Sequence, residues 1–259
     1  MARIIAVTNQ KGGVGKTTTS VNLSASLAAS RKKVLLVDLD PQGNATMGCG
    51  VDKHEVENTA CELLLGEANI RETMVKVESG FSIVPTNTDL TAAEVAIMDM
   101  PQREQKLRYQ LTIVKDEFDY IIIDCPPSLS MLTINALVAA DGVLIPIQCE
   151  YYALEGLTSL LDTIEKVKAA ANPNLEIEGL LRTMADPRNN LSNEVSAQLL
   201  KHFGKKVYTT MIPRNVRLAE APSHGIPVME YDRSSRGAVS YMALAAEIIR
   251  KAKMKSVAI

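Results

Sequence analysis

Residues 8–19 combine two lysines, three glycines and a run of threonines in a spacing suited to holding phosphate. The segment reads Thr-Asn-Gln-Lys-Gly-Gly-Val-Gly-Lys-Thr-Thr-Thr. Glycines allow backbone N–H groups to close around phosphate oxygens, and a helix that starts after them presents further unpaired donors. Lys16 can reach the β- and γ-phosphates, and the Thr17 hydroxyl can ligate Mg²⁺. We therefore predict a nucleotide-binding loop made of Lys11, Gly12, Gly13, Val14, Gly15, Lys16, Thr17 and Thr18.

This loop departs from the usual phosphate-loop pattern. Position 10 is Gln where that pattern has glycine, and Lys11 adds an early cation. A dinucleotide-binding fingerprint is excluded, because Thr18 stands where its third glycine should be. A second cation near the γ-phosphate stabilises charge on the transferring phosphoryl group. Lys11 and Lys16 are therefore predicted to be catalytic, and a simple glycine turn between strand and helix is the alternative.

Three aspartates follow apolar runs that have the composition of buried parallel strands. Asp38 and Asp40 come after a short aliphatic run, and Asp124 follows Tyr-Ile-Ile-Ile. The carboxyl ends of parallel strands meet at one edge of a sheet, so these side chains are expected beside the loop. We predict that Asp38, Asp124 and Thr17 form a Mg²⁺ site. Asp40 is predicted to hold or polarise an attacking water, with N-capping or solvated aspartates as the alternative for Asp38 and Asp40.

The elements that must position these residues alternate along the chain. Apolar runs predict strands at 4–7, 33–37, 81–84, 120–124, 142–147, 176–183 and 207–212. Helical patterns occur at 17–30, 59–65, 92–115 with a break near Pro101, 130–140, a segment ending near 171, 193–203 and 236–253. This alternation predicts one α/β domain over residues 1–259, a doubly wound, mostly parallel sheet with helices on both faces.

Several of these segments resemble the ParA/MinD family of ATPases, and within it the ParA/Soj branch that partitions chromosomes and plasmids. They are the early-lysine loop, Asp-x-Asp-Pro-Gln-Gly-Asn-Ala-Thr from Asp38, Ile-Ile-Ile-Asp-x-Pro-Pro through Asp124, and Pro-Arg-Asn-Val-Arg-Leu-Ala-Glu-Ala-Pro-Ser from Pro213. The resemblance covers nearly the whole chain. It implies a P-loop NTPase fold, ATP and Mg²⁺ as cofactors, and an ATPase that is slow without its partner and DNA.

The resemblance also implies roles for particular residues at the nucleotide. Lys11 would reach across the interface of an ATP-bound homodimer to the partner subunit's nucleotide, and Asp40 would be required for hydrolysis. Pro213 and Asn215 would flank the adenine.

A second set of residues is implied at the dimer interface and at DNA. Gln148 and Glu150 lie in a stretch near the family's interface, although a carboxylate at a helix start is an equally good interpretation of Glu150. Arg188 and Arg217 fall where Soj-like proteins carry DNA-contacting arginines, whose planar guanidinium suits phosphate.

The distribution of charge supports a polyanion-binding face. Residues 181–259 hold 13 Lys and Arg against 6 Asp and Glu, whereas residues 1–180 hold 15 against 24. An ordinary solvated surface is the alternative. The sequence has no helix-turn-helix or zinc-finger pattern, so binding to double-stranded DNA is expected to be non-specific. The resemblance implies a ParB/Spo0J-like centromere-binding partner that accelerates hydrolysis.

Composition excludes several other classes of protein. Apolar content is 46% and charged content 22%, as in an ordinary globular chain. No run is long enough to span a bilayer and the first residues lack a signal-peptide pattern, so a cytoplasmic protein is expected and membrane binding is not. The ParA/Soj resemblance adds that the protein would be associated with the nucleoid. The four cysteines form no Cys-x-x-Cys pair, which argues against a zinc site. Iron–sulfur relatives of the family carry a Cys-Gly-Gly motif, which is missing from this sequence, so electron transfer is not expected.

Two other functions remain open. One is a MinD-like membrane-associated regulator of cell division or positioning, in which 236–253 would be a membrane-surface helix instead of a helix packed on the sheet. Residues 236–259 contain neither Phe nor Trp, which favours packing. The other is a small-molecule enzyme, such as a ligase that phosphorylates a carboxylate.

Overall fold

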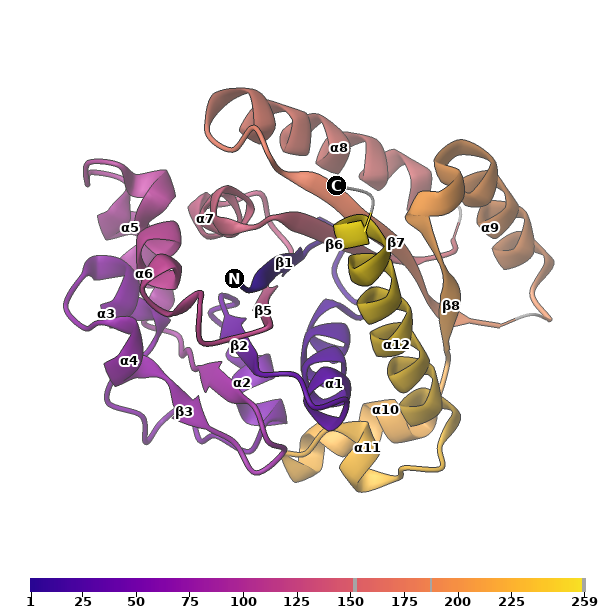
Figure 1. Cartoon of the computed structure of the whole chain (residues 1–259), viewed down its shortest axis with the longest axis horizontal. Coiled ribbons are helices and arrows are strands. Elements are labelled where there is room, and N and C mark those ends of the chain that lie inside the picture. The colour runs from indigo at the N-terminus through magenta and orange to yellow at the C-terminus, as the bar shows by residue number, and fades with distance from the viewer. Residues whose placement is uncertain (151–152, 187, 258–259) are drawn as a thin grey trace.

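A twisted sheet runs through the middle of the molecule (Figure 1). The computed structural model describes residues 1–150, 153–186 and 188–257, with the backbone alone at 153–155 and 255–257. Within these residues the strands are β1 (Arg3–Val7), β2 (Val34–Asp38), β3 (Val75–Lys76), β4 (Ser82–Val84), β5 (Tyr120–Asp124), β6 (Gly142–Gln148), β7 (Glu176–Ala185) and β8 (Val207–Pro213). Their order is β3-β4-β2-β5-β1-β6-β7-β8, and only the β3–β4 ladder is antiparallel. The predicted α/β class and mostly parallel sheet are confirmed.

Helices cover both faces of this sheet. One face carries α3 (Ala60–Leu65), α4 (Ile70–Thr73), α5 (Leu90–Ile97), α6 (Lys106–Val114), α7 (Met131–Ala139), α8 (Ala153–Ala170) and α9 (Asn190–Phe203). The other carries α1 (Lys16–Ala29), α2 (Asn44–Gly48), α10 (Val216–Glu220), α11 (Val228–Tyr231) and α12 (Arg236–Val257). The sheet is therefore doubly wound. No helix of the described ranges is long and apolar enough to cross a membrane.

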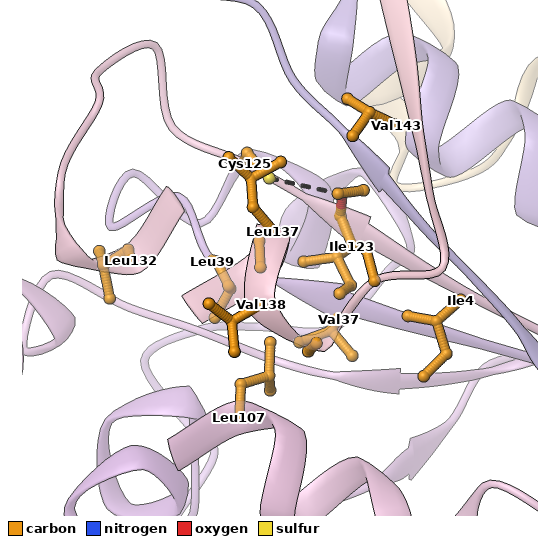
Figure 2. Packing of buried hydrophobic residues seen from close by; sticks show 14 of the residues in the cluster. Ile4, Val37, Leu39, Leu107, Ile123, Cys125, Leu132, Leu137, Val138 and Val143 are labelled. Atoms are coloured by element: carbon orange, nitrogen blue, oxygen red, sulfur yellow. Dashed lines mark hydrogen bonds between the residues drawn. The ribbon is translucent and has the colours of Figure 1, made fainter. Parts of the chain in front are cut away.

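The central strands are buried on both faces, which is why their sequences are continuously apolar. Along β5, Ile121 and Ile123 pack into the cluster under α6 and α7, while Ile122 packs into the cluster under α1 and α12. Figure 2 shows Val37 and Ile123 of neighbouring strands in the first cluster, between the sheet and α7. Close packing of this kind holds the strand ends, and the side chains that follow them, in fixed positions.

Several short elements lie outside the sequence prediction. These are β3, of two residues, and the four- or five-residue helices α2, α4, α10 and α11. Each is too short to show a repeating apolar pattern, so tertiary contacts decide its conformation. The predicted helix at 92–115 is divided as expected, since α5 ends at Ile97 and α6 begins at Lys106.

Candidate nucleotide-binding site

The glycine-rich loop joins β1 to α1 at the carboxyl edge of the sheet. Gly13 and Gly15 adopt left-handed backbone conformations, with φ of 72° and 86°. A β-carbon at Gly13 would meet no atom within 4 Å, so the backbone angle and not lack of space requires glycine there. The loop is tied to β7, because Thr183 Oγ1 donates to the Val14 oxygen at 2.8 Å. The chain therefore turns sharply and presents the N-terminus of α1.

The two lysines of the loop lie in different environments. The Lys16 side chain is largely buried, with 7% of the residue exposed, and its Nζ donates to the Lys11 oxygen at 3.3 Å. Burial lowers the pKa of Lys16, and the charges of Asp124 and Asp40 oppose that shift. Lys11 extends to the surface, where its Nζ lies 2.6 Å from Glu150 Oε2 of the same chain. Lys16 is thus held within the site and Lys11 at its rim.

Asp38 and Asp124 are paired residues of adjacent strands, at the ends of β2 and β5. Both oxygens of Asp38 accept hydrogen bonds from the segment that follows. Oδ2 accepts from the Thr46 N–H and hydroxyl, both at 2.8 Å, and Oδ1 accepts from the Asp40 N–H at 3.1 Å. Thr46 Oγ1 in turn accepts from the Thr86 N–H at 3.0 Å. Asp38 therefore anchors α2 to the strand.

Asp124 is bonded less completely. Its Oδ1 accepts from the Ser20 hydroxyl at 2.8 Å, but its Oδ2 is buried and has no hydrogen-bond partner. Burial raises the pKa of Asp124, with a further contribution from the charge of Asp38, while the nearby hydroxyls of Thr17 and Ser20 favour the charged form and oppose the rise. The pKa of Asp38 is also raised by burial. Two buried carboxyls side by side, one with a free oxygen, form a site where a cation is favoured.

These residues fit a magnesium ion. Carboxylate and hydroxyl oxygens are the donors Mg²⁺ prefers, and the unpartnered Oδ2 of Asp124 is available to the ion or to one of its waters. The described residues contain no group of three or more His, Cys, Asp and Glu side chains able to hold a metal. Mg²⁺ usually keeps several waters and binds through few protein ligands and substrate phosphates, so such a group is not required.

Asp40 is held near Lys16 by a tight turn. The residue is 8% exposed, and its Oδ1 accepts from the Gln42 N–H at 3.1 Å. The turn closes with the Gly43 N–H donating to the Asp40 oxygen at 2.8 Å, at a Gly43 φ of 64°. A β-carbon at Gly43 would approach the Thr86 oxygen to 2.8 Å, so both space and backbone angle require glycine. Asp40 is placed at the end of a short, constrained segment.

A hollow of about 180 Å³ opens beside the loop, between the ends of β7 and β8 and α12. Four of its lining residues are among those predicted from the sequence to bind the nucleotide, namely Gly15, Thr18, Pro213 and Asn215, and the Asn215 Oδ1 is buried without a hydrogen-bond partner. Sequence reasoning missed Thr183 and Tyr241, which line the hollow from segments far away in the chain. No local motif marks either residue. The hollow has the mixed lining, mostly apolar with a few aimed polar atoms, that suits a base.

The predicted DNA-contacting arginines lie on the surface, and each is paired within the chain. Arg188 Nη2 and Nε lie 2.8 and 2.9 Å from the Asp186 carboxylate, and these hydrogen bonds lower the pKa of Asp186 to about 2. Arg217 Nη1 lies 2.8 Å from Glu220 and its Nε 3.4 Å from Asp232. Among the described residues, neither arginine forms a hydrogen bond with the glycine-rich loop.

Comparison of the sequence with known proteins identifies its relatives. A family model described as an AAA domain matches residues 2–177. The sporulation initiation inhibitor protein Soj of Bacillus subtilis is 53% identical over 249 residues, which cover 96% of this chain and 98% of Soj. The chromosome partitioning protein ParA of Myxococcus xanthus is 50% identical over 257 residues, which cover 99% of this chain and 91% of that protein. This chain belongs to the ParA/Soj family of partitioning ATPases.

Similar solved structures show that this chain has the fold of P-loop NTPases. A cobyrinic acid a,c-diamide synthase from Mycobacterium smegmatis, crystallised with an ATP analogue and magnesium, is 36% identical with a TM-score of 0.86, covering 98% of this chain and 96% of that one. The Pyrococcus furiosus cell division ATPase MinD is 28% identical with a TM-score of 0.80, covering 96% and 99%. The resemblance to the ParA/MinD family and its ParA/Soj branch, which the sequence motifs predicted, is confirmed.

Proposed function

We propose that this protein is an ATP-dependent DNA-partitioning switch. ATP closes two copies into a homodimer, the dimer binds double-stranded DNA without sequence preference at the nucleoid, and Mg²⁺-dependent hydrolysis releases it. A ParB/Spo0J-like centromere-binding protein accelerates hydrolysis. The observation that carries the proposal is the meeting of Lys16, Asp40 and the half-bonded Asp124 at one sheet edge, next to the Asn215 hollow.

The chain offers separate groups for each part of ATP. Backbone N–H groups of residues 12–18 would bind the phosphates, with Lys16 contributing charge from within the site. The base would enter the hollow, where Pro213 supplies an apolar wall. The unpartnered Asn215 Oδ1 would accept a hydrogen bond from the exocyclic amine of adenine.

Thr17 and Asp124 would hold Mg²⁺, and Asp38 would fix the segment that carries Asp40. The ion, when bound, neutralises charge on the β- and γ-phosphates. Asp40 would orient the attacking water and accept its proton, because a carboxylate at a constrained position can act as a general base. Lys11 and Lys16 would stabilise charge that develops on the transferred phosphoryl group.

Dimerisation would exchange the partner of Lys11. Its ion pair with Glu150 lies at the surface, where 40% of the Lys11 and 48% of the Glu150 side chain are exposed. Exposed pairs contribute about 0–1 kcal/mol, so Lys11 can leave Glu150 for a nucleotide phosphate of the second subunit at little cost. Glu150 and its neighbour Gln148 would then lie at the interface.

DNA binding would use Arg188 and Arg217, doubled by the dimer. Both arginines are exposed, and their intrachain carboxylates would compete with DNA phosphates. Because each phosphate contact releases counterions, retention on DNA should fall steeply with salt.

The deciding experiment is retention on random-sequence duplex DNA with no nucleotide, ADP, ATP or a non-hydrolysable analogue, each across a salt series. We expect retention only with ATP or the analogue, a steep loss with salt, and a strong loss in Arg217→Glu. The matched control is Arg108→Glu, which reverses an exposed charge on α6. Absence of retention in every nucleotide state at low salt would exclude the DNA switch.

The likeness to a diamide synthase supports one alternative, an ATP-dependent ligase that activates a small carboxylate. Such an enzyme would hydrolyse ATP only when its carboxylate substrate is present, and DNA would leave the rate unchanged. The likeness to MinD supports a membrane-associated regulator, which would bind anionic vesicles in the presence of ATP and show no DNA retention. Binding to vesicles and to DNA, measured across the same nucleotide series, distinguishes the DNA switch, the ligase and the membrane-associated regulator.

A further inference from the structure

A second and larger hollow lies at the opposite edge of the sheet from the phosphate loop. Its volume is about 1300 Å³, and it opens at the N-terminal ends of β7 and β8. Residues of α8, α9 and α12 line it, and Figure 1 shows these three helices grouped around the β7–β8 side of the molecule. None of the residues assigned to the nucleotide or to DNA lies in it.

The floor of this hollow is apolar and its rim carries exposed apolar side chains. Ile164, Leu175 and Val207 form part of the floor and are buried in the core. Leu200 of α9 and Met254 of α12 are 45% and 67% exposed at the rim. Large side chains of this kind, gathered around a concavity, are typical of surfaces that bind another molecule.

Four cations at the rim have no partner among the residues that the structure describes. Within the described ranges, Lys168 of α8, Lys205 and Lys206 after α9, and Arg250 of α12 form no ion pair and no side-chain hydrogen bond. They come from three separate elements, so the charge surrounds the hollow instead of following one helix face.

Four carboxylates line the hollow, and three of them contact cations or N–H groups of the chain. Glu178 and Glu176 lie 2.6 and 3.8 Å from Arg3, whereas Glu165 of α8 is exposed at the rim. Glu247 accepts from the Thr209 and Thr210 N–H groups at 3.0 Å and lies 3.6 Å from Lys251. The lining holds six Lys and Arg residues against these four acids, so it keeps a net positive charge.

A buried arginine adds a second, independent indication. Arg182 is 7% exposed and lines the hollow. Its guanidinium donates to neutral oxygens only, the Ser196 hydroxyl at 2.9 Å and the carbonyls of Tyr208 and Thr209 at 2.9 and 3.3 Å. Its Nε has no hydrogen-bond partner, and among the described residues no carboxylate lies within 4 Å. Burial lowers the pKa of Arg182, and the charge of Glu247, which is not in contact with it, opposes that shift only in part. A buried cation with no carboxylate in contact is unfavourable, and an anionic occupant would compensate it.

We propose that this hollow docks an acidic amphipathic helix of a partner protein. Apolar side chains of the helix would fill the floor between α8 and α12, and acidic side chains on its flanks would pair with Lys168, Lys205, Lys206 and Arg250. Docking of an amphipathic helix into an apolar groove is a common mode of peptide recognition, and the charged rim fixes its orientation and selects against basic segments.

Other occupants fit the surface less well. The hollow exceeds the roughly 300–1,000 Å³ typical of small-molecule pockets. A DNA backbone offers phosphates but no apolar group for the floor, and a flat membrane surface cannot reach the bottom of a concavity. Only a segment that carries both acidic and apolar side chains satisfies both features.

The test starts from a displayed library of randomised helical peptides of about 16 residues, or roughly four turns, selected against the full-length protein without nucleotide. Selected peptides are then measured by fluorescence anisotropy against the wild type, Lys205→Glu/Lys206→Glu and Leu200→Ser. Arg108→Glu is the matched charge control, and thermal melting confirms that each variant folds. Labelled duplex DNA and vesicles of phosphatidylglycerol are measured with the same proteins.

We expect the selected peptides to combine acidic residues with an apolar stripe at helical spacing. Their Kd should rise at least tenfold in the double reversal, rise in Leu200→Ser, and stay within about twofold in Arg108→Glu; tenfold corresponds to about 1.4 kcal/mol. Peptides that bind the double reversal as tightly as the wild type, or that are basic, would overturn the proposal. The proposal would also be overturned if no peptide were selected and the Lys205→Glu/Lys206→Glu variant lost its binding to DNA or to vesicles. The Arg217→Glu retention assay is separate, so failure here leaves the DNA switch untouched.

Discussion

Asp38 and Asp124 are register partners at the ends of neighbouring strands, yet only Asp38 is fully hydrogen-bonded within the protein. Asp38 accepts from the segment that leads to α2, whereas Oδ2 of Asp124 has no partner. The two carboxylates, alike in sequence context, are therefore suited to different tasks. Asp38 orients the segment that carries Asp40, and Asp124 is the better placed to receive a cation.

Asp124→Asn should stabilise the metal-free protein at alkaline pH. Burial raises the pKa of Asp124, so the folded form keeps a proton that the unfolded chain has already lost. This contribution to stability is present at low pH and is lost as pH rises through the raised pKa. Asparagine carries no charge and can still accept from Ser20. We expect a melting temperature a few degrees above that of the wild type at about pH 8, since ~1 kcal/mol corresponds to about 2–4 °C for a chain of this size.

The gain in Asp124→Asn should shrink as the pH is lowered toward about 3, below the ordinary Asp pKa of about 3.9, where the wild-type carboxyl is mostly protonated in both states. Asp99→Asn, at an exposed position, is the control and should change little. A destabilisation of equal size at both pH values would show that the Asp124 charge is compensated in the metal-free protein. Asp124→Asn should also lose the increase in ATP affinity that Mg²⁺ gives the wild type.

Lys11→Ala should abolish ATP-dependent dimerisation and leave folding intact. The Lys11 side chain contributes only an exposed ion pair to the single chain, so the melting temperature of the variant should be close to that of the wild type. Sedimentation velocity with a non-hydrolysable analogue measures the dimer. Glu150→Gln removes the same ion pair but keeps the cation, and it should still dimerise. A Lys11→Ala dimer as stable as the wild type would refute the cross-subunit role.

Asp40→Ala should bind ATP but hydrolyse it at least about a hundredfold more slowly, the usual loss for a general base. Asp40 contacts its own turn and does not line the hollow beside Pro213 and Asn215. The nucleotide affinity of the variant should therefore stay within a few-fold of the wild-type value. DNA retention with ATP should then persist where the wild type releases. Phosphate release under single-turnover conditions gives the rate, and normal hydrolysis by the variant would exclude Asp40 from the chemistry.

Asn215→Ala should weaken the preference for ATP over GTP. The Asn215 Oδ1 is buried without a partner, and an adenine amine would satisfy it where the guanine carbonyl would not. One hydrogen bond of about 1–1.5 kcal/mol predicts a loss of roughly tenfold in discrimination. Binding of fluorescent ATP and GTP analogues measures the ratio. An unchanged ratio would mean that the base does not contact this amide.

Parts of the site that are continuous in sequence could be predicted from it. The loop at residues 11–18 needs left-handed glycines, a lysine and a threonine next to one another, and these constraints are local. The acids at 38, 40 and 124 could be placed as well, because a fully apolar run that ends in a carboxylate is typical of a buried parallel strand. Parallel strands bring such ends to one edge whatever the rest of the chain does.

Tertiary structure decided the contacts between segments that no pattern links. Thr183 of β7 and Tyr241 of α12 meet at the hollow beside Pro213 and Asn215, and Lys11 pairs with Glu150, which lies 139 positions away in the chain. It also decided which of two similar aspartates keeps a free oxygen. Within the described residues, it brought cations without ion pairs, from α8, from the turn after α9 and from α12, around one hollow. Sequence periodicity records which face of an element is buried, but pairing between distant elements depends on packing and on the fixed positions of a shared sheet.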